Sequence, residues 1–460
     1  MAKADRTLTM IDLFAGCGGL SLGMEKAGFK PIFVSELNKD AMSSYVANRP
    51  FFKEHEDLLC NDIDELLENK LAPLRKVRKA LKDRGLLQVC GRGTSLDLIC
   101  GGPPCQGFSG IGHRRSYGVD KQDLPSNQLF HKMLTVIQAF QPKIFLFENV
   151  KGLLSAKWTS EDERPNIWQQ VYETYRETLK NYTVRWELVS SKEYGVPQNR
   201  PRVLMVGIRN DVRKSAGLAS YDAYPSDFVT QTAVLTGFLP VPEGDTAPNP
   251  AELFGDLEDP DIAKILHNVR SGKQPYPNGV LQTTRYPARA TRRIRAAFRS
   301  HPSGKAVKLT HHQYSKHKAE IIEKFHFMIS NEGKIPESMR TKKFAQRVLG
   351  KDWPAGGPNI TVTSLPDDYV HYSQPRILTV REWARLQTFP DWYEFRGPRT
   401  TGGHRRAGNP RSGKFDREAP LYTQIGNAVP VVLAESVGMH FEGLISAMRS
   451  SNLRKEKVSL

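Results

Sequence analysis

The stretch LTMIDLFAGCGGLSLGMEKAG, residues 8–28, contains an apolar run, a glycine cluster and then apolar residues at helical spacing. This order predicts a strand, a glycine loop and a helix, the unit with which α/β proteins bind nucleotide-like ligands. The dinucleotide fingerprint is GxGxxG, whereas Gly16, Gly18 and Gly19 are crowded and Ser21 stands at the next fingerprint position. The spacing therefore disfavours a dinucleotide.

A second predicted strand, residues 32–35, ends in Glu36 about 20 residues beyond the glycines. An acid at the end of this strand can accept hydrogen bonds from both hydroxyls of a ribose. Asp62 and Ile63 come later, and at a strand end they could hold an adenine by its amino group and one face. Glu36 on its own is also typical of a solvated residue before a helix.

The stretch GGPPCQGFS, residues 101–109, follows a third apolar run. Its prolines fix φ near −65° and its glycines allow close approach by a ligand, so the loop holds Cys105 at one place. We interpret Cys105 as a presented thiol. An isolated free cysteine is also often a small buried hydrophobe, and this loop alone does not decide between the two.

Two further charged groups stand next to apolar runs. Glu148 ends a fourth predicted strand, residues 143–147, where a carboxylate is costly to place without a task. Arg200 and Arg202 precede another apolar strand, residues 203–208, and can face the same edge. Since ligands of open α/β sheets bind at the carboxyl ends of the strands, we expect all these groups at one edge.

The character of the chain changes at residues 211–372, where alternating strands and helices disappear. Residues 285–318 contain ten Lys or Arg and no Asp or Glu, with Tyr286, Phe298 and Tyr314 interleaved. This composition is typical of a phosphate-contacting surface, although a basic surface without a fixed partner has the same composition.

The pattern of the first domain resumes at Arg376, with a helix predicted to start at a Thr379 cap. The segment QIGNAVP, residues 424–430, precedes an amphipathic helix over residues 431–447. Residues 66–95 look inserted; their basic, helical pattern predicts a solvated face.

Composition narrows the class of protein. The 460 residues predict two domains, and 66 Lys and Arg against 49 Asp and Glu give a net charge of +17 that favours a polyanionic partner. The five cysteines form no disulfide framework and no zinc spacing, so we expect no metal. No run of about 20 apolar residues and no signal peptide is evident, which predicts a soluble intracellular protein.

Taken in order, these motifs resemble the cytosine-5 DNA methyltransferases of bacterial restriction-modification systems. The matching stretches are DLFAGCGGLSLG (12–23), Glu36, NDI (61–63), GGPPCQGFS (101–109), FENV (147–150), QNRPR (198–202), RILTVREWARLQTFP (376–390) and QIGNAVP (424–430). Eight matches in the order of the family exceed coincidence.

The resemblance implies an α/β fold: a Rossmann-like, S-adenosyl-L-methionine (SAM)-dependent methyltransferase domain with a mostly parallel sheet, interrupted by a smaller target recognition domain. We expect the catalytic domain over residues 1–210, the recognition domain over 211–371 and the return to the catalytic domain over 372–460. Double-stranded DNA would lie in the cleft between them.

The resemblance also implies a mechanism. Cys105 would add to C6 of a cytosine flipped out of the duplex, which makes C5 nucleophilic towards the methyl group of SAM. Glu148, with a raised pKa, would donate a proton or a hydrogen bond at N3. Arg200 and Arg202 would hold the base carbonyl, the carboxylate or a phosphate and lower the pKa of the thiol.

Cofactor residues carry over from the same motifs. The expected set is Phe14, Gly16, Gly18 and Gly19 at the amino-acid end of SAM, Glu36 on the ribose, Leu37, Asp62 and Ile63 near the adenine, and Pro104, Asn427 and Val429 around the pocket. An equally supported role for Asn427 and Val429 is to orient the cysteine loop and brace the sheet. The chain departs from the family at Leu37, where many members have a larger side chain, at Asn61 in place of a common glycine, and in longer stretches at 66–95 and 397–417.

The leading hypothesis is a monomeric cytoplasmic enzyme that methylates duplex DNA and protects it from a paired restriction endonuclease. A tRNA cytosine-5 methyltransferase would share the chemistry, but the large basic insert argues against it. A catalytically silent DNA-binding protein on the same scaffold is the other alternative. Intact Cys105, Glu148 and arginines argue against that one.

Overall fold

The structure is a computed structural model. It describes residues 7–90, 93–104, 128–157, 166–218, 232–244, 246–259, 262–273, 285–340, 346–350, 366–400 and 418–458. The expected nucleophile, Cys105, lies outside the described residues, as does most of the stretch 397–417.

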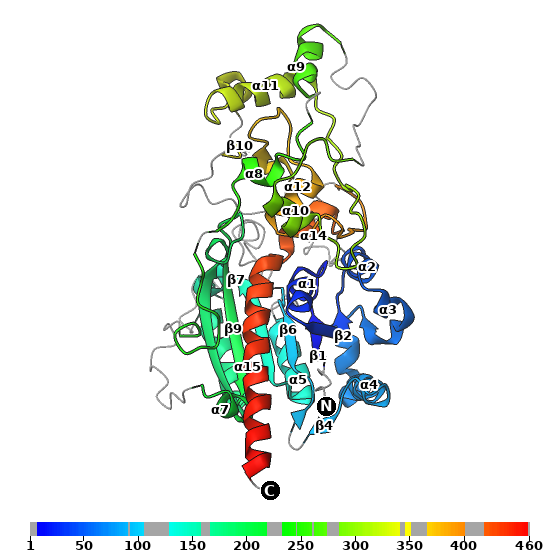
Figure 1. The fold of residues 1–460 in the computed structure, drawn as a ribbon, viewed down its shortest axis with the longest axis vertical. Coiled ribbons are helices and arrows are strands. Elements are labelled where there is room, and N and C mark those ends of the chain that lie inside the picture. Colours follow the sequence, from blue (N-terminus) through cyan, green and yellow to red (C-terminus); the bar gives the residue numbers. More distant parts are fainter. Residues whose placement is uncertain are drawn as a thin grey trace.

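A seven-stranded sheet forms the lower half of the molecule in Figure 1, with the strand order β3-β2-β1-β6-β7-β9-β8. Its strands are β1 (Leu8–Leu13), β2 (Phe29–Ser35), β3 (Leu59–Cys60), β6 (Leu98–Gly101), β7 (Ile144–Val150), β8 (Tyr182–Ser190) and β9 (Pro201–Arg209). The strands β3, β2, β1, β6 and β7 are parallel to one another, whereas β9 is antiparallel to both β7 and β8. The predicted mostly parallel α/β sheet is confirmed.

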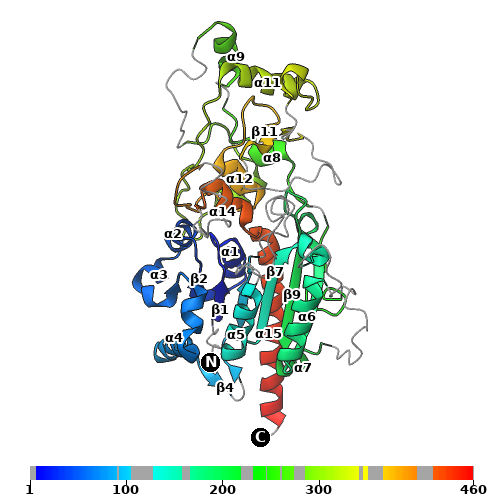
Figure 2. The same cartoon turned by 180° about the vertical axis from the view of Figure 1, so that it is seen from behind.

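Both faces of the sheet are covered by helices. Successive residues of β1 point to opposite faces of the sheet, so Ile11 belongs to one apolar core and Met10 to the other. On one face lie α1 (Gly19–Lys26), α7 (Asn210–Ser215) and α15 (Val431–Val458), the long red helix of Figure 1. On the other lie α4 (Ile63–Asp83), α5 (Leu129–Phe140) and α6 (Ile167–Thr178), seen in Figure 2.

The stretch that looked like a solvated insertion is partly built into this core. In α4, Leu74 and Leu81 are buried, while basic residues such as Arg75 and Lys79 are exposed. The helix is interrupted at residues 68–71, where three residues have positive φ. The prediction of a solvated basic face is therefore right for one side of α4 and wrong for its apolar side.

The last helices correct the expectation that the chain has no apolar stretch of about 20 residues. Residues Leu421–Ser451, which span α14 (Leu421–Asn427) and most of α15, are long and apolar enough to cross a membrane by length and composition alone. Of the apolar window, 56% is buried, and α15 packs along α1. A buried core helix accounts for this composition.

The upper half of the molecule combines the middle of the chain with residues that follow it. A third apolar core joins α8 (Pro250–Phe254) and α10 (Arg292–Phe298) to α12 (Val380–Leu386) and α14. Farther from the sheet, α9 (Ile262–Arg270) and α11 (Ala319–Ser330) pack around Tyr314 in a small separate cluster (Figure 1). The remaining helices and strands are α2 (Lys39–Ala47), α3 (Pro50–Glu54), β4 (Val89–Cys90), β5 (Gly93–Thr94), β10 (Arg347–Val348) and β11 (Tyr369–Val370).

Buried arginines hold this third core together. Arg385 of α12 lies between two carboxylates, with Nη1 2.5 Å from Oδ1 of Asp256 and Nη2 2.6 Å from Oδ2 of Asp391. Arg376 makes a two-pronged pair with Glu382 at 2.7 and 2.8 Å. Because Asp256 comes from the middle segment, the Arg385 cluster ties that segment to the returning chain. We call the buried charged residues around α12 the joint: Arg376, Arg381, Arg385, Asp256, Glu382 and Asp391.

Candidate active site

The chain that leads into the cysteine loop is held by the end of β7. A Cβ atom on Gly102 would lie 2.6 Å from Oε2 of Glu148, so a side chain at this position would displace the Glu148 carboxylate. Nδ2 of Asn149 donates a hydrogen bond to the carbonyl oxygen of Pro103 at 3.0 Å. The last described residues before Cys105 therefore lie directly beside the Glu148 carboxylate.

Glu148 is paired with one of the two predicted arginines. Nε of Arg202 lies 2.6 Å from Oε1 of Glu148, and the two residues are 7% and 9% exposed. They meet because β9 runs antiparallel to β7, which places the start of β9 at the carboxyl edge of the sheet. In an all-parallel sheet the same arginine would lie at the opposite edge.

Arg200 has a different environment. It is 3% exposed, and its Nη2 donates to the carbonyl oxygen of Gly426 at 2.7 Å. Burial and the positive charge of Arg202 lower the pKa of Arg200. Since Gly426 belongs to QIGNAVP, Arg200 connects the Glu148 region to the C-terminal segment. Its predicted contact with the base or a phosphate stays a prediction.

Two buried glutamines extend this connection, and the sequence motifs alone assigned them no role. Nε2 of Gln198 donates to the carbonyl oxygen of Leu386 and to Oε1 of Gln387, both at 2.7 Å. Nε2 of Gln387 in turn donates to the carbonyl oxygens of Ile425 and Ala428 at 2.8 and 3.1 Å. The sequence offers one sign of this role: each glutamine is an uncharged amide within a matched motif, QNRPR (198–202) or RILTVREWARLQTFP (376–390).

The glycine loop is shaped mainly by protein contacts. A Cβ on Gly19 would collide with the carbonyl oxygen of Val429, and one on Gly18 would lie 2.8 Å from Nη1 of buried Arg49. Gly18 also has φ +87°, which side-chain-bearing residues rarely adopt. Gly16 has φ +56° and open space where its Cβ would be. Gly18 and Gly19 thus serve packing, and Gly16 is the glycine that a ligand can approach.

The Glu36 carboxylate is held in place by backbone donors. Its Oε2 accepts from the N–H of Gly16 and its Oε1 from the N–H of Asn38, both at 2.8 Å. Burial raises the pKa of Glu36. A carboxylate has about four lone-pair sites, so two remain for the hydroxyls of a ribose. The next residue, Leu37, is a large apolar side chain that is 69% exposed.

Burial divides the expected cofactor residues into two groups. Those at least partly exposed are Phe14, Gly16, Glu36, Leu37, Asp62, Pro104 and Asn427; those buried are Gly18, Gly19, Ile63 and Val429. Asp62 caps α4 by accepting from the N–H of Asp64 at 2.9 Å. Ile63 is 5% exposed and packs in the core of the sheet, whereas the side chain of Leu37 is 69% exposed.

A buried acid lies beneath the glycine loop, and the sequence motifs did not single it out. Asp12 of β1 accepts a short hydrogen bond from the hydroxyl of Ser21, and burial raises its pKa to about 7. Phe14, two residues later, has φ +55°, a strained conformation for a side-chain-bearing residue. Within the described ranges no three His, Cys, Asp or Glu side chains are grouped as metal ligands would be.

Comparisons with known proteins identify the family. A family model described as C-5 cytosine-specific DNA methylase matches residues 8–442. The Type II methyltransferase M.DdeI of Desulfomicrobium norvegicum is 29% identical over 97% of this chain and 92% of its own length. The Type II methyltransferase M.XorII of Xanthomonas oryzae pv. oryzae is 27% identical over 93% and 83%.

A solved structure shares the fold. It is assigned as a DNA modification methyltransferase encoded within a prophage of E. coli, and it covers 96% of this chain and 99% of its own at a TM-score of 0.52 and 21% identity. The family match spans both the sheet and the chain's return through QIGNAVP. The chain belongs to the C-5 cytosine-specific DNA methylase family and is a DNA cytosine-5 methyltransferase.

Proposed function

We propose that this enzyme methylates one cytosine in a specific sequence of duplex DNA through a covalent Cys105 adduct, and that it protects host DNA as half of a Type II restriction-modification system. The observation that carries the mechanism is the position of Gly102 and Pro103 beside Glu148 and Asn149. The names of the relatives support the biological role, because M.DdeI and M.XorII are both Type II methyltransferases.

SAM is the methyl donor in this proposal, and the residues at the carboxyl edge fit it. Glu36 offers two lone-pair sites to the ribose, and Leu37 offers an exposed apolar surface to the adenine. Gly16 has open space where a Cβ would be, and Asn427 is exposed. When bound, SAM supplies an electrophilic methyl group to a carbon nucleophile.

The chain's own residues prepare that nucleophile. The Cys105 thiolate forms a bond to C6 of the cytosine, and the ring electrons move towards C5 and N3. Glu148 in its protonated form donates a hydrogen bond and then its proton to N3 as the ring gains electrons, and its contact with Arg202 fixes the direction in which its carboxyl group points. After C5 has gained the methyl group, a base such as water takes the C5 proton, the electrons of that bond re-form the C5–C6 double bond, and the bond from C6 to sulfur breaks to release the thiolate. N3 returns its proton to Glu148, which restores the neutral aromatic ring.

The primary test incubates the protein with labelled SAM and either duplex DNA or tRNA. We expect label in C5 of cytosine in the DNA only. Label confined to tRNA, or present in neither, would contradict the proposal. Cys105→Ser should abolish transfer and keep SAM binding, whereas Cys60→Ser, a matched change at a buried cysteine of the core, should keep both. Turnover by Cys105→Ser would remove Cys105 from its role.

Target recognition is proposed for residues 211–371, between catalytic segments 1–210 and 372–460. A swap of the recognition segment with that of a relative should retain Phe238 and Leu239, because both are buried in the core of the sheet. The methylated sequence should then change to that of the donor, as read by sequencing of modified sites. An unchanged target would place recognition elsewhere. A cytoplasmic monomer that acts alongside, but not bound to, its endonuclease completes the proposal.

A further inference from the structure

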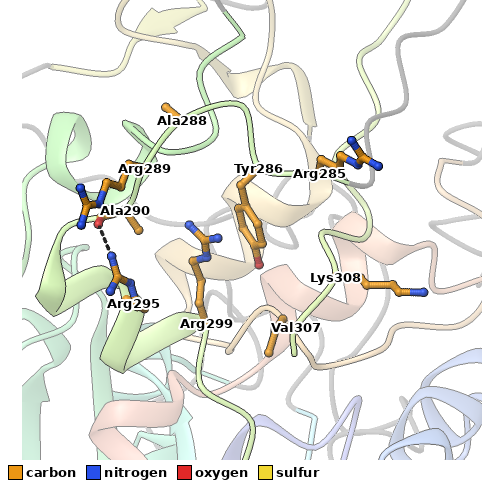
Figure 3. A pocket seen from close by; sticks show the side chains of 9 residues that line it. All are labelled: Arg285, Tyr286, Ala288, Arg289, Ala290, Arg295, Arg299, Val307 and Lys308. Carbon is orange, nitrogen blue, oxygen red and sulfur yellow. Dashed lines mark hydrogen bonds between the residues drawn. The ribbon is translucent and has the colours of Figure 1, made fainter. Parts of the chain in front are cut away.

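A basic cavity opens on the middle segment of the chain, outside the active site. Its volume is about 450 Å³, and its lining contains five cationic side chains and no acidic one. Figure 3 shows Arg289 and Arg295 on one side, Arg285 and Lys308 on the other, and Tyr286 with Arg299 between them. The remaining lining residues are Ala288, Ala290 and Val307. We call this the basic cavity.

The floor of the basic cavity consists of the half-buried side chains of Tyr286 and Arg299, which contact each other and two carboxylates. The guanidinium of Arg299 lies 3.5 Å from the centroid of the Tyr286 ring, and its Nη1 is 3.4 Å from Oδ2 of Asp256. The hydroxyl of Tyr286 donates to Oδ2 of Asp391 at 2.8 Å. Asp256 and Asp391 are the two carboxylates that enclose Arg385, so the floor contacts the joint.

The rim has the opposite character. Arg289, Arg295 and Lys308 are exposed, and none of them forms an ion pair with an acid in the part of the chain that the structure describes. Arg295 makes one weak contact, from Nη2 to the carbonyl oxygen of Ala290 at 3.4 Å. Cations brought together without acids repel one another, and an anion placed between them removes that cost.

The burial of the aromatic residues shows which contacts the basic cavity can make with an anion. Phe298 and Tyr314 are 3% and 2% exposed and sit in cores, and the Tyr286 ring is covered on one face by Arg299. Phe298 and Tyr314 therefore cannot stack on bases, and of the three interleaved aromatic residues Tyr286 is the one that lines the basic cavity. What the cavity offers is guanidinium forks and an ammonium, which match phosphate oxygens.

We propose that the basic cavity binds a backbone phosphate of duplex DNA and fixes the register of the DNA without reading its sequence. This inference rests on the proposed function, since it takes the substrate to be duplex DNA. Because the floor contacts the joint around α12, a phosphate held there has a fixed position relative to Gln387 and hence to the Gln198 connection described above. The occupant is one phosphodiester group, with the duplex lying across the open side.

The test is the double variant Arg289→Ala with Lys308→Ala, compared with Arg293→Ala. Arg293 is the matched control: it lies on α10 near Arg295 but outside the cavity lining, and it pairs with Glu252 at 3.4 Å. Binding of the target duplex and of an unrelated duplex is measured between about 50 and 200 mM salt. For every phosphate that the protein no longer neutralises, the fall in affinity over this range should be about 3.5-fold smaller.

We expect the double variant to lose affinity for both duplexes equally at low salt, to have a shallower salt dependence, and to keep the wild-type kcat at saturating DNA. The Arg293→Ala control should match wild type. An unchanged salt dependence in the double variant would overturn the proposal, and so would a loss confined to the target duplex, which would mean base reading. Methyl transfer by wild type to duplex DNA decides the proposed function separately, so the two can fail independently. An unchanged melting temperature confirms that the variants fold.

Discussion

The arginines of the joint and those of the basic cavity lie close together, since Arg385 and Arg299 both contact Asp256, but they differ in burial and in their partners. Arg376, Arg381 and Arg385 are at most 1% exposed and are satisfied by carboxylates and carbonyl oxygens. Arg289 and Arg295 are exposed. Arginine thus stabilises the buried joint through ion pairs and, in the basic cavity, presents an exposed positive charge. In the net charge of +17 the buried arginines are cancelled by the carboxylates beside them, Asp256, Glu382 and Asp391, so the positive excess comes from cations outside the joint.

The sharpest test of this comparison is Arg385→Ala. It would leave Asp256 and Asp391 buried without their cation, and breaking a buried pair from one side costs about 3–5 kcal/mol. We expect a loss of this size in the free energy of unfolding, measured by urea titration. A loss below about 1 kcal/mol would show that the joint does not depend on Arg385.

The next prediction concerns how the free energy of unfolding depends on pH. His312 is buried beside Thr379 and the carbonyl oxygen of Leu257, and burial lowers its pKa to about 4 from an ordinary 6.5. The unfolded chain takes up this proton below about pH 6.5 and the folded chain only near pH 4, so stability is lost as the pH falls between these values. His312→Gln should make the decline shallower by up to about 1.4 kcal/mol per pH unit. Denaturant titrations at pH 6.5, 5.5 and 4.5 measure it; equal slopes would contradict the assignment.

A smaller effect is expected at the start of α12. Thr379 forms a capping box with Glu382: its hydroxyl accepts from the N–H of Glu382, and the Glu382 carboxylate accepts from the N–H of Thr379. Thr379→Ala should cost about 1 kcal/mol of stability. Thr291→Ala, which removes the cap of the exposed helix α10, is the comparison and should cost less. Equal losses would mean that burial in the joint adds nothing to the cap.

The smallest effect on stability belongs to the basic cavity. Arg289→Ala should change the free energy of unfolding by less than about 0.5 kcal/mol, because the side chain is exposed and has no ion-pair partner among the described residues. Thermal unfolding without DNA checks this. A loss comparable to that of Arg385→Ala would erase the distinction between the two groups of arginines.

Much of the fold could be predicted because its local signals agree. The apolar runs of β1 and β7, the glycine loop before α1 and the Thr379 cap all correspond to structure at the expected residues. The strand direction of β9 could not be predicted, because an apolar run has no direction. That direction is what brings Arg202 to Glu148.

The place of the expected site residues in the fold could be predicted from the strands that precede or follow them, but their contacts could not. Glu36 and Leu37 lie where a ribose and an adenine could meet them, whereas Ile63 faces the core because it begins a helix whose apolar side packs inward. The partner of Arg200 is a backbone carbonyl more than 200 residues away, which no local pattern encodes. The same holds for the carbonyl acceptors of Gln387.

The contact between the glycine loop and the C-terminal segment has a consequence for synthesis. Cys17 reaches Gln424, 407 residues later, and Gly19 packs on Val429. At about 5–20 residues per second, the loop leaves the ribosome roughly 20–80 s before its partner exists. A nascent or truncated chain therefore lacks the segment against which its glycine loop packs, and the loop completes its contacts only after residues 424–429 have been made.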